Sequence, residues 1–169
     1  MEKRILVLIL FGGLMIYNIT GCIRDAKKVA DPFYYTFSNG DLQIVPLIKP
    51  YKIECVQGQE SNWSMDFSDG YGTFNIKRID VNDSIIYLLC GQIDSINSIT
   101  FISGIGNVPT AWFILDTKKK KEVGFKTLVE FNNFLKSSHY GHPRWRNIDS
   151  LYTRLCNGGN QPWLDQISK

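Results

Sequence analysis

Residues 85–90, IIYLLC, decide the fold, because six consecutive apolar side chains are typical of a central strand that is covered on both faces. The preceding residues 81–84, VNDS, are of the types that form a hairpin turn. A second run, AWFILD at 111–116, predicts another strand, and the lysines 118–121 follow it in a turn. We therefore expect residues 85–90 to lie inside a sheet.

Shorter β-rich runs surround this centre. Pro46 and Pro50 stand at the margins of two of them, where a missing backbone donor is tolerated. In a third, WSMDF, large apolar side chains alternate with small or polar ones, as in a strand that is buried on one face. The further strands that we expect are 42–47, 51–56, 63–67, 74–81, 99–102 and 122–125.

Two helices follow the strands. Thr127 and Glu130 have the spacing of a capping box, and the apolar residues after them fall on one stripe, which predicts a helix at 128–136. A second helix is expected at 148–156, before a stop signal at Gly158 or Gly159. Strands first and helices last indicate an α+β fold, with a mainly antiparallel sheet and the two C-terminal helices packed on one face.

The N-terminus has the features of an export signal. Lys3 and Arg4 precede twelve residues without a charge, ILVLILFGGLMI at 5–16. A membrane-spanning helix needs roughly 20 apolar residues, whereas this shorter stretch suits a secretory signal peptide. We therefore assign residues 1–21 to a signal peptide.

The last residues of this signal and the next one, ITGC at 19–22, resemble the lipobox of bacterial lipoproteins. The resemblance implies cleavage after Gly21 and lipidation of Cys22, so that acyl chains such as palmitate anchor the chain to a membrane. Ile23 stands where an aspartate would retain a lipoprotein in the inner membrane of many Gram-negative bacteria, which favours the outer membrane. An ordinary secreted protein with a cysteine at the cleavage site is the alternative.

The rest of the chain divides into a tether and one domain. Residues 22–40 mix charges with Pro32 and a turn, without a sustained period, and predict a lipidated tether. Residues 41–169 predict a single α+β domain. The formal net charge of +3 falls to +2 without residues 1–21, which carry two basic residues and one acidic. This balance indicates no nucleic-acid partner, and no motif indicates a cofactor.

Three cysteines remain in the predicted domain, and at most one disulfide can join two of them. Cys55 and Cys90 lie in strand-like runs, where a disulfide between them and two buried thiols are both open alternatives. Cys156 ends the second predicted helix. An inert or structural role is the expectation for all three.

The segment HYGHPRWR at 139–146 holds the best candidates for a binding site. Tyr140, Arg144 and Trp145 are of the residue types that anchor protein interfaces, and we predict that they contact a protein partner. In the alternative, the segment is a plain loop whose Trp145 tucks into the core. The lysines 118–121 have two interpretations as well, a patch for phosphate or anionic lipid and a solvated hairpin tip; the second needs no partner.

A catalytic hypothesis has few residues to use, because His139 and His142 are the two histidines of the chain. Cys90 as nucleophile with either histidine as base would give a cell-wall-directed cysteine hydrolase. Such a nucleophile needs the start of a helix, whereas Cys90 ends an apolar strand, so we predict no catalytic residue. The two imidazoles are an incomplete metal site unless Asp149 joins them, and no metal is predicted.

A wider pattern combines VPLIKPY at 45–51, Trp63, WFILDT at 112–117 and GFKTLVEFNNFL at 124–135. It resembles small uncharacterised or immunity-type lipoproteins of Bacteroidota. The resemblance implies binding and not a named reaction. Our first hypothesis is a non-catalytic, lipid-anchored envelope protein that binds another protein, in one form an immunity protein that neutralises a toxin. The cysteine hydrolase and a structural envelope component are the alternatives.

Overall fold

A computed structural model describes residues 31–59, 62–67, 72–92 and 108–167. For residues 166 and 167 it describes the backbone and not the side chains. The predicted signal peptide, Cys22, most of the predicted tether and the strand expected at 99–102 lie outside these residues. From Pro32 onward the chain forms one compact unit. No helix among the described residues is long and apolar enough to cross a membrane.

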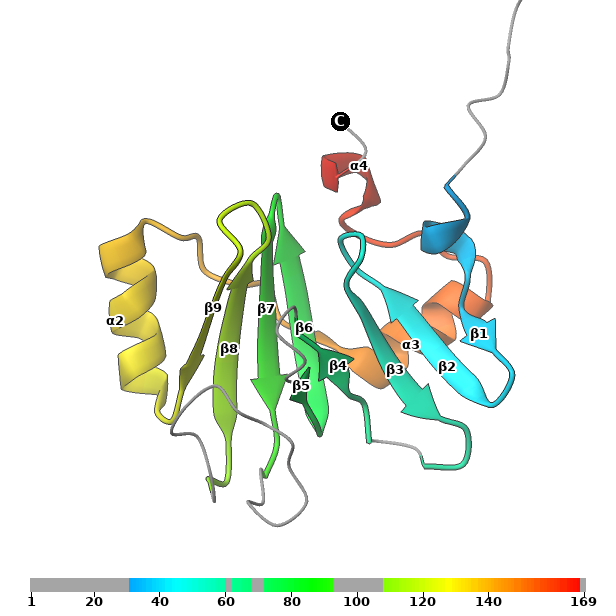
Figure 1. Cartoon of the computed structure of the whole chain (residues 1–169), viewed down its shortest axis with the longest axis horizontal. Coiled ribbons are helices and arrows are strands. Elements are labelled where there is room, and N and C mark those ends of the chain that lie inside the picture. The colour runs from blue at the N-terminus through cyan, green and yellow to red at the C-terminus, as the bar shows by residue number, and fades with distance from the viewer. Residues whose placement is uncertain (1–30, 60–61, 68–71, 93–107, 168–169) are drawn as a thin grey trace, which may run out of the picture. The chain divides into compact units, whose positions relative to one another are not determined.

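A five-stranded antiparallel sheet forms the centre of this unit, in the order β10-β6-β7-β8-β9. Figure 1 shows β6, β7, β8 and β9 side by side. Its strands are β6 (Ile76–Asn82), β7 (Ile85–Cys90), β8 (Ala111–Asp116), β9 (Lys121–Phe125) and β10 (Arg146–Asn147). The run IIYLLC is the middle strand β7, and five of its six residues are buried. The prediction of a central, doubly covered strand is confirmed.

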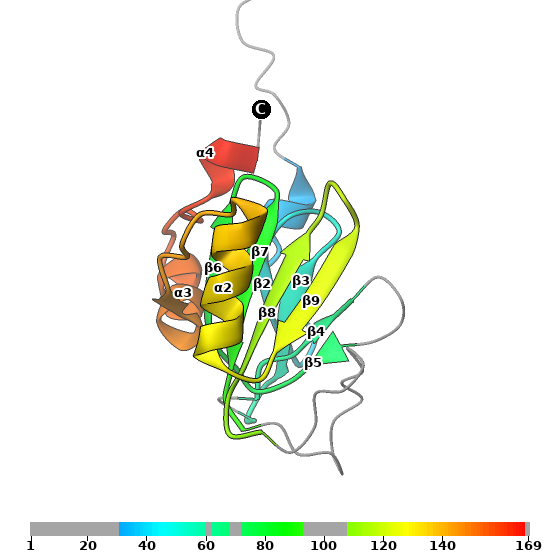
Figure 2. The ribbon, with the colours of Figure 1, turned by 90° about the vertical axis from the view of Figure 1, so that its left-hand side faces the viewer.

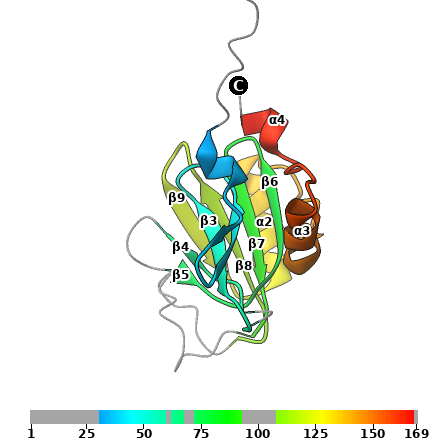
Figure 3. The same cartoon turned by 90° about the vertical axis from the view of Figure 1, so that its right-hand side faces the viewer.

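A second, three-stranded antiparallel sheet joins β1 (Ser38–Asn39), β2 (Leu42–Pro46) and β3 (Lys52–Val56). A small ribbon of β4 (Met65–Asp66) and β5 (Gly72–Thr73) is connected to it through a bridge between Glu54 and Ser64. Figure 3 shows this second sheet in front of the first.

The predicted boundary of the domain at residue 41 is too late. Pro32–Tyr35 form a short 3-10 helix, η2, and β1 pairs with β2. The side chain of Gln161 donates a hydrogen bond to the carbonyl of Tyr34 at 2.9 Å. Residues 32–39 therefore belong to the folded unit, because their backbone groups are engaged by a strand and a side chain far along the sequence.

The helices α2 (Leu128–Ser138) and α3 (Ile148–Cys156) confirm the α+β class, and a short α4 (Leu164–Ile167) follows. Thr127 caps α2 through both bonds of the predicted capping box. The expectation that both helices pack on one face is wrong. The buried residues of α2 and of α3 belong to two different apolar clusters, and α2 lies in front of the five-stranded sheet in Figure 2.

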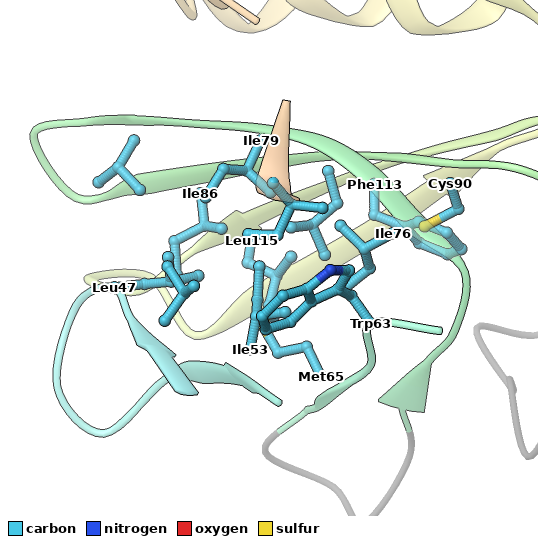
Figure 4. Packing of buried hydrophobic residues seen from close by; sticks show 14 of the residues in the cluster. Leu47, Ile53, Trp63, Met65, Ile76, Ile79, Ile86, Cys90, Phe113 and Leu115 are labelled. Atoms are coloured by element: carbon cyan, nitrogen blue, oxygen red, sulfur yellow. The ribbon is translucent and has the colours of Figure 1, made fainter. Parts of the chain in front are cut away.

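The alternation of side chains along β7 explains this arrangement. Ile86 and Leu88 join the first core, which also contains α3, the second sheet and the fully buried Trp63 (Figure 4). Ile85 and Tyr87 point the other way and join the second core under α2. A strand that is apolar on both faces requires a cover on each, so a single layer of helices could not satisfy it.

Candidate functional site

The α2–β10 loop, residues 139–145, packs on the second core through Tyr140 and Trp145, in the same cluster as the buried residues of α2. It begins at His139, which ends α2 in the left-handed conformation with a φ of 58°. The hydroxyl of Tyr87 on β7 donates a hydrogen bond to the carbonyl of Gly141 at 3.0 Å. Burial of this tyrosine, with the neighbouring charge of Asp80, raises its pKa to about 12. The phenol therefore stays protonated and acts as a donor to the loop.

Asp80 on β6 is the second anchor of the loop, and it is only 4% exposed. Its carboxylate accepts a hydrogen bond from the backbone N–H of Arg144 at 2.8 Å and pairs with the guanidinium of Arg146. Asp80 lies opposite Tyr87 in the sheet. One buried charge thus holds the backbone just before β10 in a fixed place.

Asp116 at the end of β8 is the third anchor and is also 4% exposed. It accepts the hydroxyl of Tyr140 at 2.7 Å and the backbone N–H of Lys119 at 2.9 Å, and it pairs with the ammonium of Lys119 at 3.3 Å. Burial alone would raise the pKa of Asp116, but these bonds outweigh it and lower the pKa below its ordinary value of 3.8. The carboxylate is therefore charged, and it ties the loop to the β8–β9 turn.

Hydrogen bonds and an ion pair connect the β6–β7 turn to the β8–β9 turn. Thr117 donates two hydrogen bonds to the carbonyl of Ser84, both at 2.9 Å, from its backbone N–H and its hydroxyl. Lys118 pairs with Asp83 at 2.8 Å, and Lys121 lies over the ring of Phe134. The two turns and the end of α2 therefore form one connected rim.

The side chains that this rim shows to solvent are mostly basic. Arg144 and residues 118–121 are exposed, and the buried aspartates accept the backbone N–H groups of Arg144 and Lys119. We call these five residues the loop–hairpin surface. A surface whose backbone is already fixed loses little conformational entropy when it binds.

The three predicted contact residues have different surroundings. Trp145 is half-buried in the second core, with its ring 6.1 Å from that of Phe131. Tyr140 packs on the same core and is held by Asp116. Arg144 alone has an exposed side chain. The alternative in which Trp145 tucks into the core describes its position, while Arg144 remains available for a partner.

Cys90 is a buried thiol and not an activated nucleophile. It is 1% exposed, it belongs to the first core, and burial raises its pKa to about 12. Its sulfur shares a hydrogen bond with the hydroxyl of Thr73. His139 and His142 belong to the loop that packs on the opposite face of the sheet, so neither pairs with Cys90 in the way that a cysteine hydrolase requires.

The other reactive residues are engaged elsewhere. The thiol of Cys55 donates to the carbonyl of Gln59 at 3.2 Å, which fits two buried thiols rather than a bridge to Cys90. Asp149 accepts the indole N–H of Trp63 at 2.6 Å and so does not join the histidines. Within the described ranges, no three His, Cys, Asp or Glu side chains gather as metal ligands.

Asp80 and Asp116 are the residues that the sequence pattern did not single out. Asp80 lies in IKRIDVN, between the apolar Ile79 and Val81. In a strand, this alternation of apolar and charged residues predicts that the charged side chain faces solvent. Asp116 ends the apolar run of β8 just before the hairpin, a position at which an aspartate is typical of a turn. Both side chains lie on the face of the sheet that carries the second core, and the α2–β10 loop, which follows later in the sequence, covers them.

Comparisons with protein-family models, with curated proteins and with solved structures found no match to this chain.

Proposed function

We propose that this protein is a lipid-anchored protein of the cell envelope, held in the outer membrane of a Gram-negative bacterium through Cys22. Its folded unit binds another protein through the loop–hairpin surface and catalyses no reaction. The anchor is supported by ITGC at 19–22 after a short apolar stretch. The binding role is supported by one observation: two buried carboxylates accept the backbone N–H groups of Arg144 and Lys119, two of the five exposed basic residues.

The charge of this surface indicates the chemistry of the partner. Arg144 and residues 118–121 are all exposed, and Lys118 pairs with the exposed Asp83. Opposite charges speed association and fix the orientation of two proteins. The partner is therefore a protein with an acidic patch, and in the immunity form of the proposal that protein is a toxin.

A site-specific crosslink tests the binding role. A photo-crosslinking amino acid replaces Arg144 in the full-length chain, and in a control it replaces Lys52, an exposed lysine on β3 in the other sheet. We expect position 144 to capture one protein from the envelope and position 52 not to capture it. Charge reversal by Lys120→Glu should weaken the capture from position 144. Equal capture at both positions, or none at position 144, would overturn the proposal.

The anchor is tested separately from the binding role. Full-length protein with Cys22 should incorporate labelled palmitate and sediment with membranes, whereas Cys22→Ser should do neither. Cys156→Ser is the matched control, because Cys156 is an exposed thiol on α3 and its loss should leave both properties unchanged. Palmitate incorporation in Cys22→Ser would contradict the assignment of the anchor.

A further inference from the structure

The short helix η2, with the sequence PFYY, presents a proline and an aromatic ring to solvent. In a 3-10 helix, residues three apart lie on the same face, and the burial of η2 follows that period. Pro32 and Tyr35 are exposed, whereas Phe33 and Tyr34 between them are half-buried. Tyr35 is 52% exposed and is one of four exposed large hydrophobic side chains in the described part of the chain. The outer face of η2 is therefore a small hydrophobic surface.

Several hydrogen bonds hold η2 in a fixed place on the folded unit. The hydroxyl of Thr36 donates to the carbonyl of Pro32 at 2.9 Å and closes the helix. The carbonyl of Tyr34 accepts the side chain of Gln161, and the hydroxyl of Tyr34 accepts the backbone N–H of Lys49 in the β2–β3 turn at 3.4 Å. The exposed ring next to Tyr34 in the sequence thus stands on a support that the C-terminal segment and the second sheet both hold.

The distance along the chain between η2 and the proposed lipid anchor is short. Nine residues, 23–31, separate Cys22 from Pro32. Fully extended, this interval reaches at most about 35 Å. A folded unit of this size has a radius of gyration of about 14 Å, so its diameter is similar to that reach. An anchor at Cys22 therefore keeps η2 within about one molecular diameter of the bilayer.

We propose that η2 lies in the headgroup region of the bilayer that holds the anchor, with the ring of Tyr35 among the phospholipids. Tyrosine is enriched at membrane–water interfaces because its ring is apolar and its hydroxyl is polar. Lys49, next to η2, has an exposed side chain, which favours phospholipids with anionic headgroups. One ring binds a bilayer too weakly to anchor a protein, so this contact orients the folded unit. The inference rests on the proposed anchor and not on the proposed protein-binding role.

Photo-crosslinking from η2 tests the proposal. The aromatic photo-crosslinker p-benzoylphenylalanine replaces Tyr35 in the full-length chain, and in two controls it replaces Asn39, exposed at the end of β1, or Val129, 68% exposed on α2. Asn39 is four residues farther along the chain than Tyr35 and controls for mere proximity to the anchor. Figures 1 and 3 show α2 on the opposite side of the folded unit from η2.

The cells are grown with radiolabelled phosphate, because the acyl chains of the anchor contain no phosphorus and label on the protein then reports captured phospholipid. We expect label after irradiation when the crosslinker is at position 35 and none when it is at position 39 or 129. Sedimentation with membranes is measured on the same samples.

A second measurement places the crosslinker at Pro32, which shares the exposed face with Tyr35. Tyr35→Asp should abolish phospholipid capture from position 32, because a carboxylate is repelled by anionic headgroups and lacks the ring. Tyr35→Phe keeps the ring and should retain the capture. Val129→Asp is the matched control, since it introduces the same charge at an exposed position far from η2 and should leave the capture unchanged.

The outcomes separate this inference from the proposed anchor. Protein that sediments with membranes but captures no phospholipid from position 35 would overturn the inference and leave the anchor intact. Protein that neither sediments nor captures phospholipid would overturn both. Equal phospholipid capture from positions 35, 39 and 129 would show that the unit has no fixed orientation, and capture of a protein from position 35 would assign η2 to a protein interface. Either of these results contradicts the proposal.

Discussion

Replacing Asp80 by asparagine should destabilise the folded unit far more than the same change at Asp83. Removal of one partner of a buried ion pair costs about 3–5 kcal/mol. The side chain of Arg146 is 32% exposed, so water compensates part of this cost, and we expect a loss of about 2–3 kcal/mol. Asp83 pairs with Lys118 at the surface, where both side chains are more than two-thirds exposed. Asp83→Asn should therefore lower the free energy of unfolding by less than about 1 kcal/mol.

Urea unfolding of the full-length chain, followed by tryptophan fluorescence at pH 7, measures both changes. A high salt concentration should reduce the effect of Asp83→Asn and leave that of Asp80→Asn, because a buried pair is screened less. Hydrogen exchange gives a local measurement, since the Arg144 amide donates directly to Asp80 and should exchange at least about tenfold faster in Asp80→Asn. If the two variants unfolded at the same urea concentration, Asp80 would not anchor the loop.

Three further predictions concern titratable groups. The pKa of Asp116 is lowered in the folded state, so its contribution to stability is present above its ordinary pKa of 3.8 and is lost as the pH falls through the folded pKa. Tyr140→Phe removes one of the bonds that lower this pKa and should therefore reduce the loss of stability in acid, measured by urea unfolding at a series of pH values. Because the pKa of Tyr87 is raised from 10 to about 12, stability should fall between these pH values by up to about 1.4 kcal/mol per pH unit, and Tyr87→Phe should flatten that slope. In native protein a thiol reagent should label the exposed Cys156 within minutes and label Cys90 only on unfolding; rapid labelling of Cys90 would restore the hydrolase hypothesis.

The long elements of the fold could be predicted because their signals are local. The runs at 85–90 and 111–116 are β7 and β8 with the expected bounds, and the capping box of Thr127 and Glu130 begins α2 where the sequence placed it. The strand β10 is different. It has two residues and no periodicity, and it exists because Arg146 and Asn147 pair with β6. Only tertiary structure brings such a strand into a sheet.

The site was less predictable, because its anchors look like surface residues. Asp80 is 64 residues from Arg144, whose amide it accepts, and Asp116 is 24 residues from Tyr140. Residue type identified Arg144 as a candidate for contact with a partner. The same argument predicted that Trp145 contacts a partner, whereas in the structure its ring packs on Phe131. Aromatic residues serve cores and interfaces alike, so composition alone does not separate the two roles.

The buried aspartates themselves argue that the loop has a function beyond covering the sheet. An apolar pair of similar volume is often as stable as a buried ion pair, or more stable, so Asp80 and Arg146 are a poor choice if stability is the only requirement. A carboxylate differs from a leucine in accepting donors from defined directions, and here it takes the amide of Arg144 and the guanidinium of Arg146. Asp116 does the same for Tyr140 and Lys119. Apolar contacts would allow the loop and the turn to slide over the second core, whereas these bonds fix the positions of Arg144 and of the lysines, which is what a binding surface requires.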